Sequence, residues 1–600
     1  MPAPLTLKYV TGGFTVLTSC VRISNLSLED IMPESQSIVL AQRIVGALIA
    51  AGVNDIVYCP GSRSAPLAYA LDSAVRGDLV RAHIRLDERS AGFLALGLTR
   101  RWASEPTCQD VEDLSPVAIV TTSGGAVAEL HASVAEAAHA HRPLIVLSAD
   151  RPDEMRGVGA SQTTIQHGIF GPHAPTVLDL PADSELDQRV DSRVARAVHR
   201  ACGRPSGVAG PVHINVAFRD PLTPQSGSAT LEPLSLTKIS TPSIYRPRRL
   251  GQAWEDLVDS SLRTVIVAGD GDDQSGQAWA AYAKIPIFAE PTSVLACDPN
   301  RIAHQQVLLA SPLAEQIQQV IVTGRPTLSR PVSALLGRND IRLIVVDPHD
   351  EWVDVQGRAS EVVASLAPPR QISTDEAWLE QWKEAGRRVS QQIRTILDES
   401  PMSVLVLADL VWSHDSRPLM VGASNSIRAL DLVGVGGHGR SVVSHRGLAG
   451  IDGTIASAIG LACVREEPTV ALMGDLTFFH DAGALAIPAD EAAPDLLIFV
   501  ADDGGGSIFS TLEHGRPENA PTFERWFATA QPQSLEHLAH AYGVDYVECM
   551  TRQDVMRELD SDVHGIRICH VKCARPAQIA DVRKLADQIE YHRKRAGKIQ

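Results

Sequence analysis

Short apolar runs alternate with longer amphipathic segments over the first third of the chain. The apolar runs are typical of buried strands and cover residues 55–58, 117–120, 144–147 and 211–216. The segments between them have the periodicity of helices and include residues 38–51, 91–101 and 126–140. Strands that alternate with helices of this length form parallel sheets covered by helices. The pattern therefore predicts a doubly wound α/β domain.

The same alternation returns twice farther along the chain. The second unit has predicted strands at residues 264–268, 320–323 and 342–346, and the third has them at 419–422, 470–473, 496–500 and 566–571. A passage rich in Ser, Thr and Pro at 224–247 and a polar helix at 374–397 separate the units. We expect an α/β protein of three doubly wound parallel-sheet domains, with bounds at 32–225, 226–398 and 399–600.

The first 31 residues lack this pattern. Residues 10–21 are mildly apolar but are broken by glycine and threonine, and no cleavage site follows them, so a signal peptide is not expected. Met32 stands just before the first predicted helix. We therefore expect residues 1–31 to be a disordered or non-native extension, with Met32 as the physiological start.

Composition narrows the class of protein. The 600 residues are 44% hydrophobic and 21% charged, which is ordinary for a globular chain, and the net charge is −17. This charge argues against nucleic acid or an anionic membrane as the main partner, so an anionic substrate would need local arginines. No apolar stretch approaches the length of a membrane helix. The nine scattered cysteines fit a reduced, cytoplasmic enzyme.

Two acidic, glycine-containing turns end neighbouring strands of the third unit. Gly474 and Asp475 close one apolar run, and a second run leads into Asp502, Asp503 and residues 504–506, with Asp503 28 residues after Asp475. Carboxylates bind a hard cation, and glycines allow the backbone to approach a diphosphate. The spacing resembles the thiamine diphosphate fingerprint, although Asp502 and Asp503 replace its usual Asn pair. The alternative is an ordinary strand end with a polar turn.

Polar side chains also follow the strands of the first unit. Arg63 lies in a tight loop after the first strand, Glu88 precedes an apolar helix, and later strand ends carry Thr122, Arg151, Ser161 and Gln162. Polar residues at the ends of consecutive strands indicate one continuous site along a sheet edge. Taken singly, Arg63 is equally well a solvated loop residue, and Glu88 a charge partner of the helix N-terminus.

The third unit adds a turn suited to an anion. Ser424 and Arg428 stand at a strand-to-helix turn, and Arg446 precedes residues 450–453. Together with Arg63 and Arg151, these arginines in an acidic protein suggest a substrate with several carboxylates, although each one alone is as well explained as a surface charge.

Six segments in order resemble one family, the 2-succinyl-5-enolpyruvyl-6-hydroxy-3-cyclohexene-1-carboxylate synthases, which are thiamine diphosphate-dependent enzymes of menaquinone biosynthesis. They are residues 60–66, 87–97, 148–152, 159–162, 210–221 and 444–453. The resemblance runs from about residue 38 to the last helices. Departures include Gly125 for Thr, His445 for Asn, and Ser161 for a longer Asn.

The resemblance implies a role for each matching residue. Glu88 would activate the cofactor, and Gln162 and Ser161 would lie near the reacting carbons. Isochorismate would be held by Arg63, Arg151 and Arg330, and 2-oxoglutarate by Ser424, Arg428 and Arg446. The implied contacts of thiamine diphosphate are Glu88, Thr122, Ser424, Ile451, Gly474, Asp475, Leu476, Thr477, Ile508 and Phe509. The implied ligands of Mg²⁺ or Mn²⁺ are Asp475 with either Asp502 and Gly504 or Asp503 and Gly505, of which we prefer the second pair.

The reaction implied is a transferase reaction: decarboxylation of 2-oxoglutarate and conjugate addition of the remaining unit to isochorismate. A homodimer or homotetramer with its active site at the subunit interface is expected, because in related enzymes the glutamate and the diphosphate site come from different subunits. Two alternatives stay open at this point. One is another thiamine diphosphate-dependent 2-oxoacid decarboxylase or carboligase, and the other is a non-catalytic nucleotide-binding or regulatory module, which the Asp502 and Asp503 replacement would favour.

Overall fold

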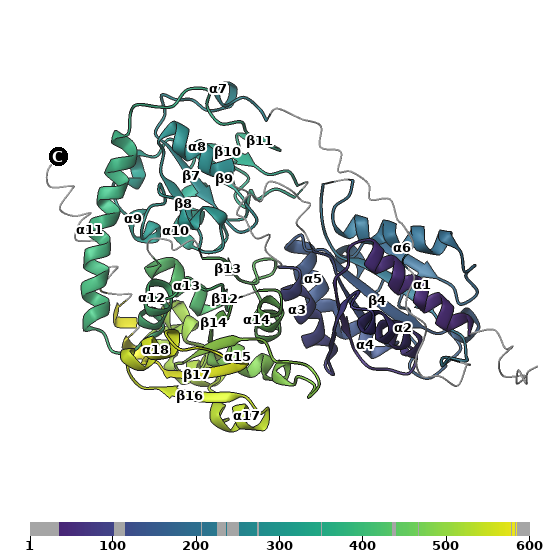
Figure 1. The fold of residues 1–600 in the computed structure, drawn as a ribbon. Coiled ribbons are helices and arrows are strands. Elements are labelled where there is room, and N and C mark those ends of the chain that lie inside the picture. The colour runs from purple at the N-terminus through teal and green to yellow at the C-terminus, as the bar shows by residue number, and fades with distance from the viewer. Residues whose placement is uncertain are drawn as a thin grey trace, which may run out of the picture.

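The computed structural model describes residues 35–100, 115–205, 207–224, 236, 251–272, 275–349, 351–434, 440–465, 467–577, 579–581 and 584. Within these ranges the chain forms three parallel sheets with helices on their faces (Figure 1). We call each sheet with its helices the N-terminal, middle and C-terminal unit. The α/β class expected from the sequence is confirmed.

The N-terminal unit contains a six-stranded sheet in the order β2-β1-β3-β4-β6-β5. Its strands are β1 (Asp55–Tyr58), β2 (Arg81–Ile84), β3 (Val117–Thr121), β4 (Leu144–Asp150), β5 (Thr176–Leu180) and β6 (Val212–Ala217). Its helices are α1 (Gln36–Ala50), α2 (Ala65–Arg76), α3 (Glu88–Leu98), α4 (Gly125–Glu129), α5 (His131–His139) and α6 (Gln188–Ala201). The central strands β3, β4 and β6 are buried along their whole length, because helices cover both faces of a doubly wound sheet.

The middle unit contains a five-stranded sheet in the order β11-β10-β9-β7-β8. Its strands are β7 (Thr264–Ala268), β8 (Ile287–Ala289), β9 (Gln319–Thr323), β10 (Arg342–Val346) and β11 (Glu361–Val363). Its helices are α7 (Trp254–Leu257), α8 (Ser275–Ala283), α9 (Gln305–Leu308), α10 (Arg330–Leu336) and α11 (Ala377–Glu399), the last of which runs down to the C-terminal unit (Figure 1).

The C-terminal unit repeats the topology of the N-terminal one. Its sheet order is β13-β12-β14-β15-β17-β16. The strands are β12 (Leu419–Val421), β13 (Val442–Val443), β14 (Thr469–Gly474), β15 (Leu496–Asp502), β16 (Asp545–Cys549) and β17 (Ile566–Lys572). The helices are α12 (Val404–His414), α13 (Asn425–Val433), α14 (Thr454–Cys463), α15 (Asp475–Asp481), α16 (Ala520–Phe523), α17 (Leu535–Ala541) and α18 (Arg552–Leu559). In both units the second strand lies on one side of the first strand and the third strand on its other side, so the order of strands reverses between the first and the third. Doubly wound folds bind ligands in the crevice at the carboxyl ends of these two strands.

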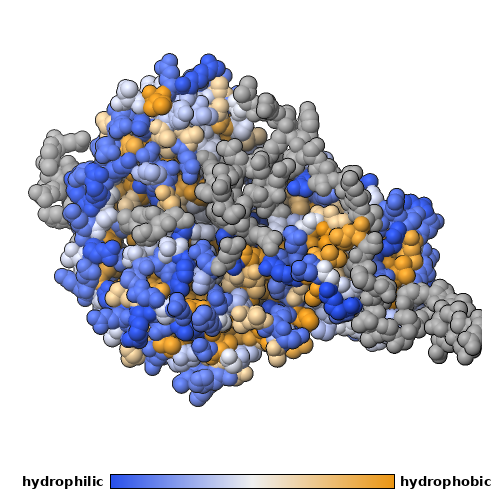
Figure 2. Space-filling model, in the orientation of Figure 1, coloured by the Kyte–Doolittle hydropathy of each residue, from blue (hydrophilic) through white to orange (hydrophobic). Residues whose placement is uncertain are grey.

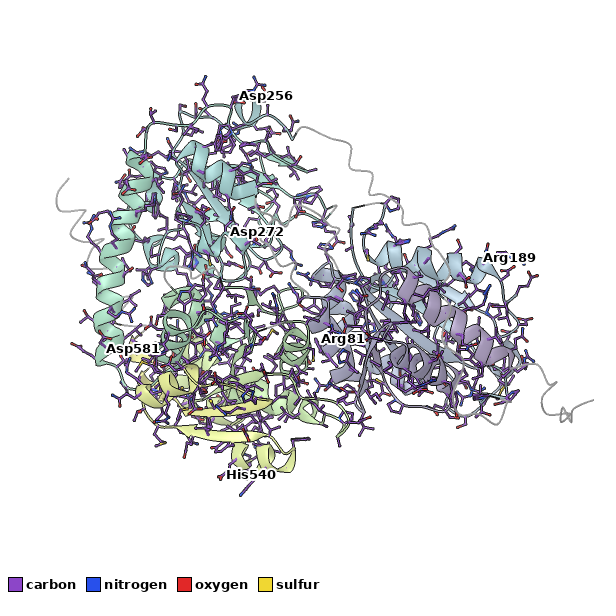
Figure 3. The ribbon with its side chains drawn as sticks, in the orientation of Figure 1. Arg81, Arg189, Asp256, Asp272, His540 and Asp581 are labelled. Atoms are coloured by element: carbon purple, nitrogen blue, oxygen red, sulfur yellow. The ribbon has the colours of Figure 1, made fainter. Side chains whose placement is uncertain are left out.

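Helices α3 and α14 join the N-terminal and C-terminal units. A Cβ atom on Gly97 would lie 2.3 Å from the Ser457 carbonyl oxygen, and one on Gly460 would lie 2.3 Å from that of Leu94. The two helices thus pack closely because both positions are glycine. Arg81, which Figure 3 labels, adds a hydrogen bond of 3.0 Å to the Cys463 carbonyl.

The hydrophobic side chains lie mainly in the cores of the three sheets. On the face shown in Figure 2, hydrophilic residues (blue) predominate and hydrophobic ones (orange) form smaller patches. Within the described ranges, no helix combines the length and the hydrophobicity that a membrane span requires.

The predicted central strands are confirmed, with β1, β7 and β10 matching at both ends. The strands missed from the sequence are β2, β5, β8, β11, β13 and β16, and each lies at an edge of its sheet. The single helix predicted at 126–140 was wrong, because α4 ends at Glu129 and α5 begins at His131. Residues 1–31 and nearly all of the passage at 224–247 lie outside the described residues.

Candidate functional site

A cavity of about 180 Å³ lies at the chain reversal of the C-terminal sheet, beyond the carboxyl ends of β12 and β14. Every described residue that lines it comes from the C-terminal unit. The lining includes all the cofactor contacts expected in this unit, namely Ser424, Ile451, Gly474, Asp475, Leu476, Thr477, Ile508 and Phe509, together with Asp503 and Gly505.

Asp475 occupies the first position of α15 and is 4% exposed. Its carboxylate accepts hydrogen bonds from the backbone nitrogens of Leu476 and Gly505, both at 2.7 Å. Burial, and then the charge of Asp502, raise the pKa of Asp475 to about 6. The carboxylate is therefore held in place by the backbone, and among the described residues it forms no ion pair.

Asp503 is the second buried carboxylate of the cavity and is 8% exposed. Burial raises its pKa to about 7, the charge of Asp475 adds to this, and a hydrogen bond with Ser507 opposes it. Two buried carboxylates with raised pKa values in one cavity are stabilised in their ionised form by a divalent cation. The donor set thus fits Mg²⁺ or Mn²⁺.

Asp502 has a different environment. Its carboxylate lies 2.8 Å from Nε2 of His570 and 2.8 Å from Nζ of Lys572. The hydrogen bond from His570 is the largest cause that holds the pKa of Asp502 well below its usual range, and Lys572 contributes as well. The structure thus separates the two aspartates that the sequence left as alternatives: Asp503 lines the cavity and Asp502 is paired with β17.

The turn between Asp503 and Ser507 depends on glycine. Gly505 has a φ of +112°, and a Cβ there would lie 2.1 Å from the Ala528 carbonyl oxygen. A Cβ on Gly506 would lie 2.3 Å from the Phe527 carbonyl oxygen. A larger residue at either position would displace this backbone. Buried carboxylates next to a glycine turn are the groups that a metal-bound diphosphate requires, so the residues present fit thiamine diphosphate.

Three arginines form a cationic group at the start of α13. Burial lowers the pKa of Arg428, and the charges of Arg446 and Arg330 lower it further, while Arg330 also pairs with Glu513 at 3.2 Å. Arg428 donates to the Ser424 carbonyl at 2.9 Å, and Arg446 donates to Oγ1 of Thr327 at 2.9 Å. Like charges held together in this way favour the binding of a carboxylate.

In the N-terminal unit, Arg151, Ser161 and Gln162 follow the carboxyl end of β4, next to the end of β3. Arg151 donates to the Gln162 carbonyl at 2.7 Å and also contacts Ser123. Gln162, with a φ of +56°, donates from Nε2 to the Ser123 carbonyl at 3.1 Å. Ser161 is exposed beside it. These residues form a second polar surface.

The remaining predicted residues of this unit are Arg63, Thr122 and Glu88. Arg63 donates to the Phe218 carbonyl at 3.0 Å, and its charge helps to lower the pKa of Arg151, after burial. The side chain of Thr122 lies against Gly61, where a Cβ would be 2.3 Å away. Glu88 is the first residue of α3, whose N-cap is Asp87. The structure does not bring this surface into the cavity of the same chain.

Sequence reasoning missed several residues of the site. Nδ2 of Asn425 donates to Ser507 at 2.9 Å, and both residues line the cavity. Arg575 donates to the Asp503 carbonyl at 3.1 Å. Thr327, which contacts Arg446, belongs to the middle unit. Asn425 follows Ser424 directly at the start of α13. Of the missed residues, it is the one that the strand-to-helix turn at Ser424 could have revealed in the sequence.

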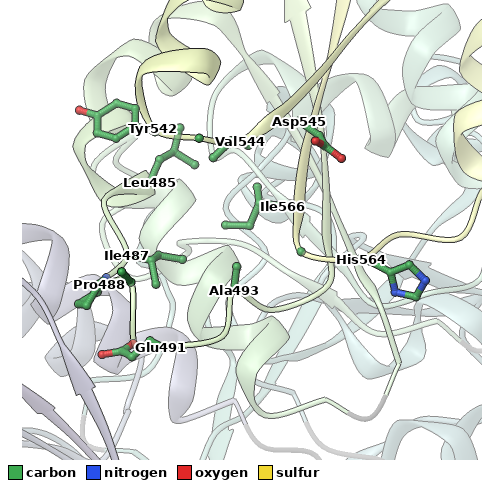
Figure 4. A pocket seen from close by; sticks show the side chains of 13 residues that line it. Leu485, Ile487, Pro488, Glu491, Ala493, Tyr542, Val544, Asp545, His564 and Ile566 are labelled. Carbon is green, nitrogen blue, oxygen red and sulfur yellow. The ribbon is translucent and has the colours of Figure 1, made fainter.

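A larger cavity, of about 300 Å³, lies at the opposite edge of the C-terminal sheet (Figure 4). It is formed where β15, β16 and β17 begin, and its lining includes Glu491, Tyr542 and His564. Glu491 also pairs with Arg85 of the N-terminal unit at 2.7 Å. This cavity contains none of the residues predicted from the sequence, so the smaller cavity is the candidate site.

Known proteins match most of the chain. The N-terminal thiamine pyrophosphate-binding domain model matches residues 38–169, and the C-terminal one matches residues 428–571. The 2-succinyl-5-enolpyruvyl-6-hydroxy-3-cyclohexene-1-carboxylate synthase of Renibacterium salmoninarum is 38% identical over 564 residues, which cover 92% of this chain and 96% of that protein. The protein of the same name from Nocardioides sp. is 40% identical, covering 89% and 98%. The one from Kineococcus radiotolerans is also 40% identical, covering 90% and 96%. The chain therefore belongs to the 2-succinyl-5-enolpyruvyl-6-hydroxy-3-cyclohexene-1-carboxylate synthase family of thiamine diphosphate enzymes.

Proposed function

We propose that the protein catalyses the decarboxylation of 2-oxoglutarate and the conjugate addition of the remaining four-carbon unit to isochorismate, as a step of menaquinone biosynthesis. The observation that carries this proposal is the combination of a buried carboxylate pair, Asp475 and Asp503, with a nearby group of three arginines. The first feature suits a metal-bound diphosphate, and the second suits a substrate with several carboxylates.

Asp475, Asp503 and the carbonyl of Gly505 would hold Mg²⁺ or Mn²⁺, and through it the diphosphate of the cofactor. When bound, thiamine diphosphate supplies the nucleophilic carbon and accepts the electron pair that decarboxylation releases. Ile451, Ile508 and Phe509 give the cavity an apolar side that excludes water from the cofactor. Gly474, Leu476 and Thr477 would complete the turn that binds the diphosphate. Asp502 would stabilise this turn indirectly, through its contacts with β17.

The arginines would orient the two substrates. Ser424, Arg428 and Arg446 bind the carboxylate of 2-oxoglutarate that does not react, and Arg63, Arg151 and Arg330 bind isochorismate. The charges of the arginines and of the carboxylates that they bind are the same before and after the reaction. The main effect of the arginines is therefore to position the reacting carbons. Gln162, with Ser161 beside it, would lie close to those carbons and to the cofactor contact Thr122.

We further propose that the active site is shared between two copies of the chain in a homodimer or homotetramer. Glu88 does not line the cavity of its own C-terminal unit. Three large apolar side chains near the second polar surface are strongly exposed, with fractions of 84% for Leu86, 70% for Val158 and 84% for Ile165. A second subunit placed there would cover them and bring Glu88 to the cofactor, where its carboxyl group would exchange a proton with the pyrimidine ring.

The reduced cysteines fit a cytoplasmic location, since the described ones are all free thiols. The direct test is incubation of the purified protein with thiamine diphosphate, Mg²⁺, 2-oxoglutarate and isochorismate, followed by mass analysis. The expected product contains isochorismate plus the four-carbon unit. Release of carbon dioxide from smaller 2-oxo acids, without any adduct to isochorismate, would favour the alternative carboligase or decarboxylase function.

A further inference from the structure

The middle unit contacts the arginine group through residues 327–330. Arg330 begins α10, and Thr327 lies three residues earlier in the loop that follows β9. Oγ1 of Thr327 accepts the hydrogen bond from Arg446 at 2.9 Å. The short segment 327–330 therefore contacts one substrate arginine and supplies another, and its position determines how the two lie relative to each other.

Glu290 holds this segment. It follows β8 directly and is 1% exposed, and its Oε1 accepts a hydrogen bond of 2.6 Å from the backbone nitrogen of Leu328. Its own backbone nitrogen donates to the Ala268 carbonyl at 2.9 Å, which ties it to β7. Glu290 thus links the end of β8 to the end of β7 through its backbone, and to the loop after β9 through its carboxyl group.

The environment of Glu290 is unusual for a carboxyl group. No Lys, Arg or His of the described residues lies within ion-pair distance of it, and its Oε2 has no hydrogen-bond partner among them. Burial, followed by the charge of Asp431, raises the pKa of Glu290 to about 8. Burying a carboxyl group without a charged partner costs stability. A residue with this cost, whose carboxyl group makes a single hydrogen bond among the described residues, is better explained by a local task than by core packing.

Asp431 provides a parallel connection to the same arginine group. It lies one turn after Arg428 on α13 and is 1% exposed. Its carboxylate accepts a hydrogen bond of 3.2 Å from Gln305 and another from Gln306, both on α9 of the middle unit. Gln305 also donates to the Ala289 carbonyl at 3.1 Å, next to Glu290. The helix that carries Arg428 and the segment that contacts Arg446 are thus anchored to the same end of β8.

We propose that Glu290 is a positioning residue of the substrate site, which holds segment 327–330 against Arg446 and so fixes the arginines around the two acidic substrates. This inference rests on the proposed function. It assigns the middle unit a task in substrate binding that acts through Leu328 and Thr327, without contact between Glu290 and either substrate.

The test compares four variants of the full-length holoenzyme. Glu290→Ala removes the acceptor, whereas Glu290→Gln keeps an acceptor oxygen and removes the acidic group. Thr327→Val removes the hydroxyl of an exposed residue and leaves the core intact. Asp354→Asn is the control, because Asp354 also accepts backbone hydrogen bonds within the middle unit, from the nitrogens of Arg358 and Ala359, but none from residues 327–330 among those described.

Steady-state kinetics should separate positioning from general stability. We expect Glu290→Ala to raise the KM for both substrates about tenfold with kcat changed by less than about threefold, the size of effect that loss of one buried hydrogen bond produces. Glu290→Gln should stay within about twofold of wild type, and Thr327→Val should raise the KM for 2-oxoglutarate alone about threefold. Asp354→Asn should leave both KM values unchanged.

Three results would overturn the inference: unchanged KM values in Glu290→Ala, a loss of kcat alone, or equal losses in Glu290→Gln and Glu290→Ala. Thermal unfolding would show whether Glu290→Ala folds. If it does not fold, Thr327→Val becomes the test, and an unchanged KM for 2-oxoglutarate in that variant would contradict the inference. A wild-type protein that makes no adduct from the two substrates would instead refute the proposed function, and the inference with it.

Discussion

The carboxylates of Asp502 and Asp503 are adjacent in the sequence but lie in opposite electrostatic environments. Asp502 is 2.8 Å from both His570 and Lys572, while Asp503 faces the cavity that Asp475 also lines. The direction of the side chain reverses at the end of β15, because successive residues of a strand point to opposite faces. We therefore expect one of them to bind the metal and the other to hold the strand.

Replacement of each aspartate should separate these roles. Asp503→Ala is expected to raise the Mg²⁺ concentration needed for thiamine diphosphate binding at least about tenfold, because it removes one of two carboxylate ligands. Asp502→Ala should leave that requirement within about twofold but lower the free energy of unfolding by about 1 kcal/mol, through loss of the hydrogen bonds to β17. Isothermal titration and denaturant unfolding measure the two effects, and the reverse pattern would exchange the assignments.

Cofactor binding should depend on pH because of the same pair. The pKa values of about 6 for Asp475 and about 7 for Asp503 lie above their ordinary value of 3.8. The stabilisation from holding these protons is complete below pH 3.8 and is lost as the pH rises through 6 and 7, so the metal-free protein becomes less stable over that interval. Mg²⁺ competes with the protons, so its affinity should rise over the same interval. Thermal unfolding at pH 5.5 and 8, with and without Mg²⁺ and cofactor, tests this, and Asp503→Asn should flatten the dependence.

Mixing inactive variants tests the shared active site. Glu88→Gln should lower turnover by at least about a hundredfold while cofactor binding persists, because only proton exchange is lost. Asp475→Ala should lose cofactor binding. If each site combines Glu88 of one subunit with Asp475 of another, reassembled mixtures should recover about a quarter of wild-type activity. No recovery in mixtures shown to exchange subunits would place both residues in one chain.

The arginine group should control the affinity for the dicarboxylic acid. Arg428→Ala and Arg446→Ala are each expected to raise the KM for 2-oxoglutarate about ten- to a hundredfold, with a smaller effect on kcat, because a charge-assisted hydrogen bond to the substrate is lost. Arg387→Ala is the matched control, since Arg387 pairs with Glu384 on the exposed face of α11. Unchanged turnover of 2-oxoglutarate in both site variants would favour a smaller substrate acid.

The glycine turn should tolerate no side chain. Gly505→Ala is expected to lower cofactor affinity at least about tenfold, because the left-handed backbone and the close Ala528 carbonyl both exclude a Cβ atom. Gly125→Ala provides the control, since a Cβ there meets no atom within 4 Å. Equal cofactor affinity in the two variants, measured by titration, would show that the turn does not form part of the diphosphate site.

The sequence predicted the centres of the three sheets and missed their edges. Strands such as β4 and β15 are buried on both faces and appear as continuous apolar runs. The edge strand β2 has the sequence Arg81–Ile84 and only one buried residue, and β16 is half exposed. Their pairing comes from backbone hydrogen bonds to a neighbour, which leave no apolar pattern in the sequence.

For the candidate site, the sequence by itself identified the strand ends that carry Asp475, Asp503 and Arg428, because local chain geometry places such residues at a parallel-sheet edge. Only the tertiary structure decided that Asp503 rather than Asp502 faces the cavity, and that Thr327 and Glu290 of the middle unit lie beneath Arg446. Those relationships depend on side-chain direction and on contacts between residues that are 38 and 119 positions apart, and neither is encoded in a local pattern.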